Sequence, residues 1–211
     1  MHIFLVRHGH RVLTPPDPEL TEQGHKQAKL TGEWLKQYPI SKVVSSPFKR
    51  TIQTAQGILQ SFNSPFEIRD NLQERMEYDP TKHATFGLFL QEWLQASKDR
   101  AYQPSVGRSS DQAGNEVKQI IEEFGQEQHS HLVLVSHGGT IADFLRTVLQ
   151  EQSTSNFLIP VEYKEHSLEI HDNDYIVNHC SITHLESIDN TWIAHMINNV
   201  DHLGSFSSPA P

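Results

Sequence analysis

Three short segments of the chain combine cationic or titratable side chains with glycine or proline, and each follows an apolar run. They are Arg7-His8-Gly9-His10-Arg11, Ser45-Ser46-Pro47-Phe48-Lys49-Arg50 and Ser136-His137-Gly138-Gly139. Arginines clamp a phosphate through bidentate, charge-assisted hydrogen bonds, and a histidine beside them can act as the nucleophile. Glycines let backbone N–H groups approach an anion without an intervening Cβ. These residue types predict phosphoryl chemistry. The first segment holds no acidic residue, so the negative charge that balances its arginines is expected to come from the substrate's phosphate.

The three segments can meet only if the fold brings them to the same edge of a sheet. Short apolar runs alternate with helical patterns, which favours an α/β sandwich with a mostly parallel central sheet. In such folds, ligands bind where the strands end and helices begin. Strands are expected at His2–Val6, Lys42–Ser45, Phe66–Arg69, His131–Ser136, Cys180–Glu186 and Trp192–Ile197.

Helical patterns separate these strands. The first helix is expected at Thr21–Tyr38, with Thr21 as its cap. The second is expected to begin with Ser46 as N-cap and Pro47 at position N1 and to end at Gln60. Three more are expected at Thr85–Ser97, Asn115–Gln126 and Gly139–Leu149. The aromatic residues of the third helix have two interpretations. They either line a substrate entrance with Met76 and Tyr78, or form the core face of an amphipathic helix, and we favour the core face for Phe86, Phe89 and Trp93.

Composition limits the class of protein. The 211 residues, with 36% hydrophobic residues and a mean hydropathy of −0.52, predict a soluble domain over residues 1–203, a possible insertion at 153–175 and a disordered tail at 204–211. The run Ile3–Val6 is too short for a signal sequence or a membrane span. A single cysteine, Cys180, allows no internal disulfide and fits the cytoplasm. A formal net charge of −9 argues against nucleic-acid binding.

Fourteen histidines raise the question of a metal site. Their spacing matches neither an HExxH motif nor a Cys/His cluster. His8 and His10 share one face of a strand, yet no third ligand follows at a recognisable spacing. The sequence therefore predicts no metal and no cofactor, and His166, His171 and His179 are expected on loops or strand surfaces.

Four blocks in order along the chain, LVRHG, PELTEQGHKQA, SSPFKRTIQTA and VSHGG, resemble the histidine phosphatase superfamily. They cover most of residues 1–60 and 131–150. The resemblance implies a three-layer, phosphoglycerate-mutase-like sandwich. It also implies that His8 attacks phosphorus and becomes a phosphohistidine, while Arg7, Arg50 and His137 hold the phosphoryl group.

The resemblance places an acidic residue after the third strand, in a segment of the form Leu-x-Glu. Asn71-Leu72-Gln73-Glu74 matches, so Glu74 is the expected general acid and later the base that activates water. Glu77 is the alternative, because the glycine and tryptophan that often follow the family's glutamate are absent here. Many relatives carry Glu, Gln or Ala in place of His10, which either contacts substrate or caps the turn. Gly138 is a possible substrate contact.

The predicted function is a metal-independent phosphatase acting on a phosphorylated small molecule or a phosphorylated protein side chain, phosphohistidine included. A phosphoglycerate-mutase-type transferase and a non-catalytic phosphate-binding module are the alternatives. Mutases enclose their phosphorylated intermediate with extra segments, and this chain is short between Gly9 and Leu20 and between Arg69 and Asn115. Leu20, Thr21 and Gly24 are expected to cap and pack a helix behind the site. The sequence does not determine the oligomeric state or the particular substrate.

Overall fold

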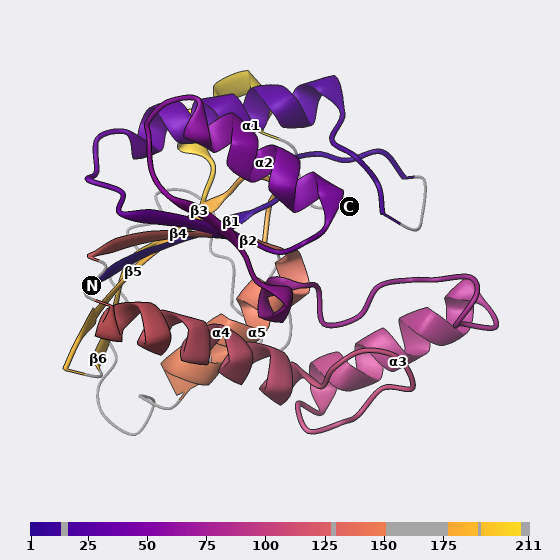
Figure 1. Ribbon diagram of the computed structural model, residues 1–211. Coiled ribbons are helices and arrows are strands. Elements are labelled where there is room, and N and C mark those ends of the chain that lie inside the picture. The colour runs from indigo at the N-terminus through magenta and orange to yellow at the C-terminus, as the bar shows by residue number, and fades with distance from the viewer. Residues whose placement is uncertain (14–16, 128–129, 151–176, 190, 208–211) are drawn as a thin grey trace.

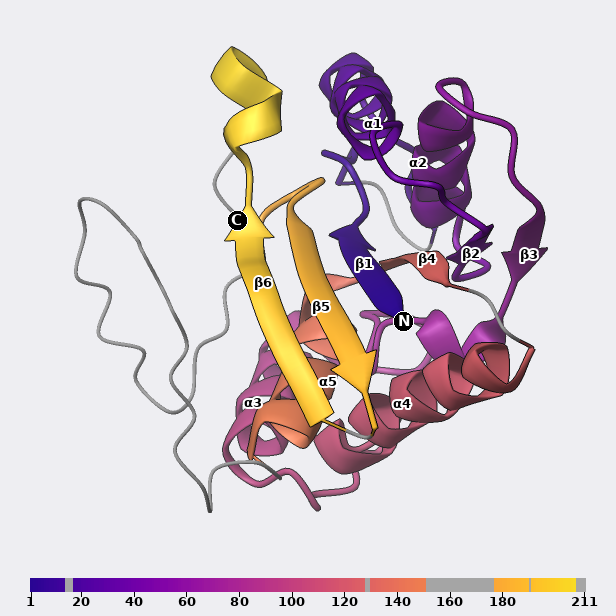
Figure 2. The same cartoon turned by 90° about the vertical axis from the view of Figure 1, so that its left-hand side faces the viewer.

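The computed structural model describes residues 1–13, 17–127, 130–150, 177–189 and 191–207, and the remaining positions are left out of this account. In the described chain, the predicted strands form one six-stranded sheet in the order β3-β2-β4-β1-β5-β6. The strands are β1 (His2–Arg7), β2 (Lys42–Ser45), β3 (Phe66–Ile68), β4 (His131–Ser136), β5 (Ile182–Ile188) and β6 (Thr191–Asn199). The first four strands run parallel to one another. Strand β5 pairs with β1 in the antiparallel direction, and β6 pairs antiparallel with β5 (Figure 2).

Helices cover both faces of this sheet, which confirms the predicted three-layer sandwich (Figure 1). On one face lie α1 (Glu22–Leu35) and α2 (Lys49–Leu59), and on the other lie α4 (Ser110–Gln126) and α5 (Gly138–Gln150). A further helix, α3 (Phe86–Lys98), extends beyond the second layer. Two short 3₁₀ helices are η1 (Asp70–Leu72) and η2 (Asp201–Phe206). No helix among the described residues is long and apolar enough to cross a membrane.

The central strands β1 and β4 contribute side chains to the hydrophobic clusters on both faces of the sheet. In β1, Ile3 and Leu5 pack toward α4 and α5, while Phe4 and Val6 pack toward α1 and α2. All four side chains are at most 1% exposed. The apolar run of β4 divides between the same two clusters. A strand buried on both faces is therefore apolar throughout, as predicted.

Helix starts show where the sequence patterns succeed and fail. The Thr21 side chain accepts from Gly24 N and caps α1, as expected. The predicted cap at Ser46 is wrong, because α2 begins at Lys49 after Phe48 and the Ser46 hydroxyl contacts other side chains. Helix α4 begins five residues before the predicted Asn115, because Ser109 forms a capping box with Gln112.

The prediction that the aromatic face of α3 forms core is confirmed for Phe89, which is buried in a small cluster with Trp93 packed against it, and is wrong for Phe86. Only Phe89 and Ala96 are buried within this helix, while Phe86 is 52% exposed. The helix packs on the segment around Met76 and Tyr78 instead of on the sheet. Its apolar side is therefore available to line a cavity.

The C-terminal tail begins later than predicted. Gly204–Phe206 form the end of η2, and the Phe206 carbonyl accepts from Gln27 Nε2 at 2.8 Å. The hydrogen bond ties this part of the chain to α1, which accounts for its order. Residues 208–211 and the possible insertion at 153–175 lie outside the described residues.

Candidate active site

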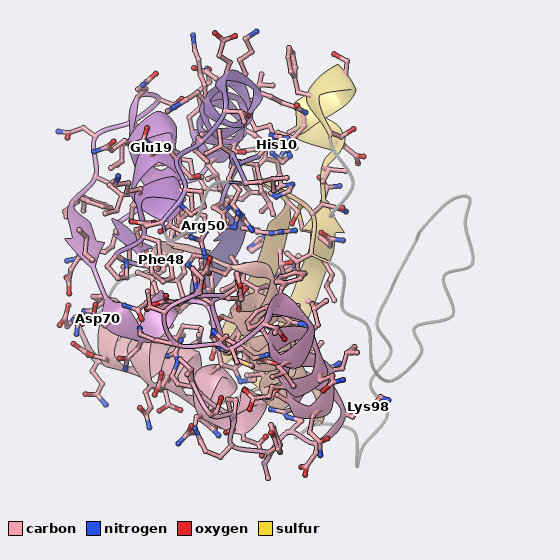
Figure 3. All side chains as sticks on the ribbon, turned by 90° about the vertical axis from the view of Figure 1, so that its right-hand side faces the viewer. His10, Glu19, Phe48, Arg50, Asp70 and Lys98 are labelled. Carbon is pink, nitrogen blue, oxygen red and sulfur yellow. The ribbon has the colours of Figure 1, made fainter. Side chains whose placement is uncertain are left out.

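The three predicted segments meet at one edge of the sheet. Their strands, β2, β4 and β1, are adjacent and parallel, so their carboxyl ends lie side by side. A cavity of about 480 Å³ opens there, and Arg7, His8 and Arg50 line it. Figure 3 looks onto this edge and shows Arg50 and Phe48 between the two outer layers. The volume is that of a small-molecule site.

His8 directly follows β1, where its backbone N–H continues the ladder by donating to Ser136 O at 3.0 Å. The side chain is 3% exposed, and ring Nδ1 lies 2.8 Å from Gly9 O. A carbonyl oxygen only accepts, so in the neutral ring Nδ1 carries the proton and Nε2 the lone pair. The backbone therefore selects the tautomer that leaves Nε2 nucleophilic.

The surroundings also keep this ring unprotonated. Burial lowers the pKa of His8 well below the usual value of 6.5, and the charges of Arg7, Arg50 and His137 lower it further. Both effects disfavour the imidazolium form. At neutral pH, His8 is a neutral nucleophile inside a cationic site.

We expect no titration step from the His8 ring near pH 6.5. Since its folded-state pKa is depressed, the ring must stay neutral as the pH falls through 6.5 and gain a proton only in stronger acid. Histidine ring proton NMR resonances recorded against pH test this, and the His8→Ala spectrum identifies the signal. A midpoint at the ordinary value would contradict the buried, cation-surrounded environment.

The two arginines supply hydrogen-bond donors that the protein does not use. Arg7 Nη1 donates to Val177 O at 2.5 Å, and burial lowers the pKa of Arg7 to about 10, so it stays charged at neutral pH. Arg50 Nη2 donates to Glu77 Oε2 at 2.7 Å. Arg7 Nε, Arg50 Nε and Arg50 Nη1 are buried without a hydrogen-bond partner among the described residues. Buried donors of this kind are costly unless a ligand accepts from them, and a phosphate would.

His137 holds Arg50 in place. Its Nδ1 lies 3.1 Å from Arg50 Nη2, which can only donate, so Nδ1 accepts. Ring Nε2 then carries the proton and donates to Ser46 Oγ at 2.8 Å. Burial and the Arg50 charge keep the pKa of His137 well below its usual value. In this arrangement both ring nitrogens are occupied, so His137 acts on the phosphate site through Arg50.

Both candidate acids line the cavity. The carboxylate of Glu74 accepts from the backbone N–H groups of Gly139 at 3.1 Å and Thr140 at 3.0 Å, in the first turn of α5. A Cβ at Gly139 would lie 2.5 Å from Glu74 Oε1 and 2.8 Å from Trp93 Cη2, so a side chain here would displace the Glu74 carboxylate. Glu77 pairs with Arg50, yet burial raises its pKa above the usual value. Gly138, the other glycine of the segment, lies in the cavity wall.

His10 lies beside the α1 cap. Its Nδ1 is 2.9 Å from Thr21 Oγ1, its backbone N–H donates to Gln27 Oε1, and it is not among the described residues that line the cavity. The packing role expected of Gly24 fits its position, because a Cβ there would lie 2.1 Å from His10 O.

His179 lies in a turn before β5, in agreement with the predicted loop position, but it is buried. Its ring is 3% exposed, with its centroid 5.5 Å from that of His8. Burial lowers the pKa of His179 to about 3. His166 and His171 lie outside the described residues.

Several residues that line the cavity were not predicted from the sequence. Arg11 and Arg146 add cations to the wall. Arg11 could have been predicted, because it ends the Arg7–Arg11 segment that follows β1. No sequence pattern points to Arg146. Arg75 stacks on Trp93 with its guanidinium carbon 4.2 Å from the ring centroid. The same guanidinium donates to both oxygens of buried Asp143, at 2.9 and 3.0 Å, and so fixes the aromatic wall to α5.

Comparison with known proteins agrees with this geometry. The model of the histidine phosphatase superfamily (branch 1) matches residues 3–200. A probable phosphoglycerate mutase GpmB of Proteus mirabilis is 26% identical over 92% of this chain and 88% of its own. Phosphoserine phosphatase 1 of Hydrogenobacter thermophilus is 29% identical over 64% of this chain and 70% of its own. The mycobacterial glucosyl-3-phosphoglycerate phosphatase structure with inorganic phosphate shares the fold, with a TM-score of 0.71, 19% identity and coverage of 95% of this chain and 98% of its own.

Proposed function

The chain belongs to the histidine phosphatase superfamily, and on that premise we propose that it hydrolyses small phosphomonoesters through a phosphohistidine formed on His8. One observation carries the proposal: His8, whose Nε2 keeps its lone pair, lines a cavity together with Arg7 and Arg50, which hold buried donors without a partner among the described residues. Relatives named as phosphatases support hydrolysis.

In the first step, His8 Nε2 attacks phosphorus, the N–P bond forms and the bond from phosphorus to the leaving oxygen breaks. Arg7 and Arg50 stabilise the charge on the equatorial oxygens, so guanidinium groups do the work that metal ions do in other phosphoryl-transfer enzymes. Glu74 gives its proton to the leaving oxygen and the alcohol departs. His137 positions Arg50 through the bond to Nη2.

In the second step, water attacks the phosphohistidine. Glu74, now a carboxylate, takes a proton from that water as the new O–P bond forms. The N–P bond breaks, its electron pair returns to Nε2, and inorganic phosphate leaves. The enzyme regains its starting protonation state, because Glu74 has received the proton that it gave.

The cavity favours a small organic phosphate with an apolar portion. Besides the arginines, the wall contains the aromatic residues Tyr78, Phe86, Phe89 and Trp93. Such a wall gains free energy by covering apolar or aromatic groups of a ligand. A volume of about 480 Å³ holds a metabolite-sized ester better than a folded phosphoprotein.

Phosphoryl transfer within one substrate is the second candidate, because the Proteus mirabilis relative is named a probable phosphoglycerate mutase. We expect the protein to release free phosphate from a panel of phosphorylated metabolites and to form no 2-phosphoglycerate from 3-phosphoglycerate. ³¹P NMR of the reaction mixtures measures both products at once. Formation of the 2-isomer without net phosphate release would reject hydrolysis in favour of the mutase.

A further inference from the structure

A second cluster of titratable side chains lies at the opposite end of the strands from His8. His2 begins β1, His184 lies in β5 and His195 lies in β6. Along β1, His2 is about 20 Å from His8, and His184, which lies opposite Phe4, is about 13 Å away, given the rise per residue of a strand. Figure 2 shows this end, where the N-terminus lies beside the end of β5. The phosphatase mechanism uses none of these residues.

Strand register places these rings on one face. His2 pairs with Glu186, and Phe4 pairs with His184, so these four side chains share the face that α1 covers. In β6, the register shifts beside His184: Met196 pairs with His184 and Ala194 with Leu185, which leaves His195 without a Cα partner. Bulges of this kind re-aim side chains and often occur at functional positions. Here the bulge accompanies the stacking of His195 on His184, with ring centroids 4.6 Å apart.

The nitrogen atoms converge as metal ligands do. One nitrogen from each of His2, His184 and His195 lies within 4.8 Å of the others, and His2 Nδ1 is 3.1 Å from His184 Nε2. Tetrahedral Zn²⁺ holds imidazole nitrogens about 3.3 Å apart, from its Zn–N bond lengths. The His195 side chain is 40% exposed, so an ion from solvent can reach this group of nitrogens.

Glu186 completes the pattern from the outside. Its carboxylate oxygens lie 2.9 Å from His195 Nε2 and 3.7 Å from His2 Nε2. The contact to His195 is a hydrogen bond, which occupies its Nε2 and leaves its Nδ1 for an ion, whereas the 3.7 Å to His2 is an ion-pair distance. A carboxylate behind a ligating histidine fixes the ring and its tautomer, the usual outer shell of a zinc site.

We propose that His2, His184 and His195 bind a divalent transition-metal ion of the Zn²⁺ type, with Glu186 as the outer-shell acceptor. Imidazole nitrogens suit Zn²⁺, whereas Mg²⁺ and Ca²⁺ prefer oxygen ligands. The site joins β1, β5 and β6 across the sheet. A bound ion would stabilise the packing of these three strands. The site lies outside the phosphoryl-transfer cavity.

The test uses untagged, chelator-treated protein with its native N-terminus, titrated with Zn²⁺ by calorimetry. We expect one ion per chain and a rise in the unfolding temperature with added Zn²⁺. Co²⁺ in its place should give the visible absorption of a four-coordinate ion. His195→Ala should weaken Zn²⁺ binding at least about 100-fold through loss of a ligand, and Glu186→Gln about 10- to 100-fold.

Two variants keep the outcome interpretable. His25→Ala removes an exposed histidine of α1 outside the cluster and should bind Zn²⁺ as the wild type does. His8→Ala should also retain the ion, which separates this site from the catalytic one. His195 and His2 are partly exposed, so their variants should fold even if a His184 variant does not. Absence of stoichiometric Zn²⁺ binding, or binding that His195→Ala leaves unchanged, would overturn the proposal.

Discussion

Replacement of His8 by alanine is expected to remove the phosphoenzyme and to lower kcat at least about 10⁴-fold, as loss of a covalent nucleophile does. The reason is geometric: the Gly9 carbonyl orients the ring, and no other described imidazole in the cavity wall offers a free Nε2. His137 cannot substitute, because Arg50 and Ser46 occupy its nitrogens. Brief incubation with a ³²P-labelled phosphomonoester, followed by denaturation, should leave acid-labile label on the wild type alone.

The control for this experiment is His25→Ala, which removes an exposed histidine in the first turn of α1 that does not line the cavity and should label and turn over like the wild type. Rates with para-nitrophenyl phosphate are measured on the same samples. If His8→Ala turned over this ester at the wild-type rate, the covalent mechanism would be wrong. If the wild type neither labelled nor hydrolysed any ester, a phosphate-binding module would remain.

Short-range patterns predicted the parallel half of the fold well. The strands at Lys42–Ser45 and His131–Ser136 have the predicted bounds, because runs buried on both faces are unmistakably apolar. The start of α4 was missed although its signal was present: Ser109 and Gln112 have the spacing of a capping box. The start of α2 was missed for another reason. Ser46 resembles an N-cap, but the fold uses its hydroxyl to hold His137.

Long-range packing accounts for what the sequence did not reveal. An amphipathic pattern in α3 shows that one side is apolar but does not say whether protein or ligand covers it. His179 and Arg146 reach the site from segments without a motif. The histidine cluster is equally invisible, since His2, His184 and His195 are brought together only by strand order and a bulge. Spacing along the sequence can reveal metal ligands that lie on one helix or one hairpin. It cannot reveal ligands that three separate strands contribute.

Glu74→Gln is expected to lower kcat about 10²- to 10⁴-fold on alkyl phosphates, whose leaving oxygen needs a proton. The same variant should keep most of its kcat/KM on para-nitrophenyl phosphate, because this quantity reports the first step and that leaving group departs readily as the anion. Its kcat on both esters should fall, since Glu74 no longer activates the water of the second step. Glutamine retains the shape of Glu74 but only one acceptor oxygen, whereas the Gly139 and Thr140 N–H groups donate to different oxygens of Glu74. One of these hydrogen bonds is therefore lost, and the unfolding temperature of the variant checks that it remains folded. Steady-state rates on the two esters measure the difference.

Glu77→Gln is the matched control, since Glu77 also lines the cavity and its pKa is raised. Its carboxylate orients Arg50 at 2.7 Å, so its loss should raise KM on both esters by similar factors and lower kcat less than Glu74→Gln does. The decisive quantity is the ratio of the two kcat/KM values, alkyl over aryl, in each variant, because kcat/KM reports the step in which the leaving oxygen departs. A ratio that collapses in Glu77→Gln and not in Glu74→Gln would place the proton donor at Glu77, whose burial already favours the protonated carboxyl.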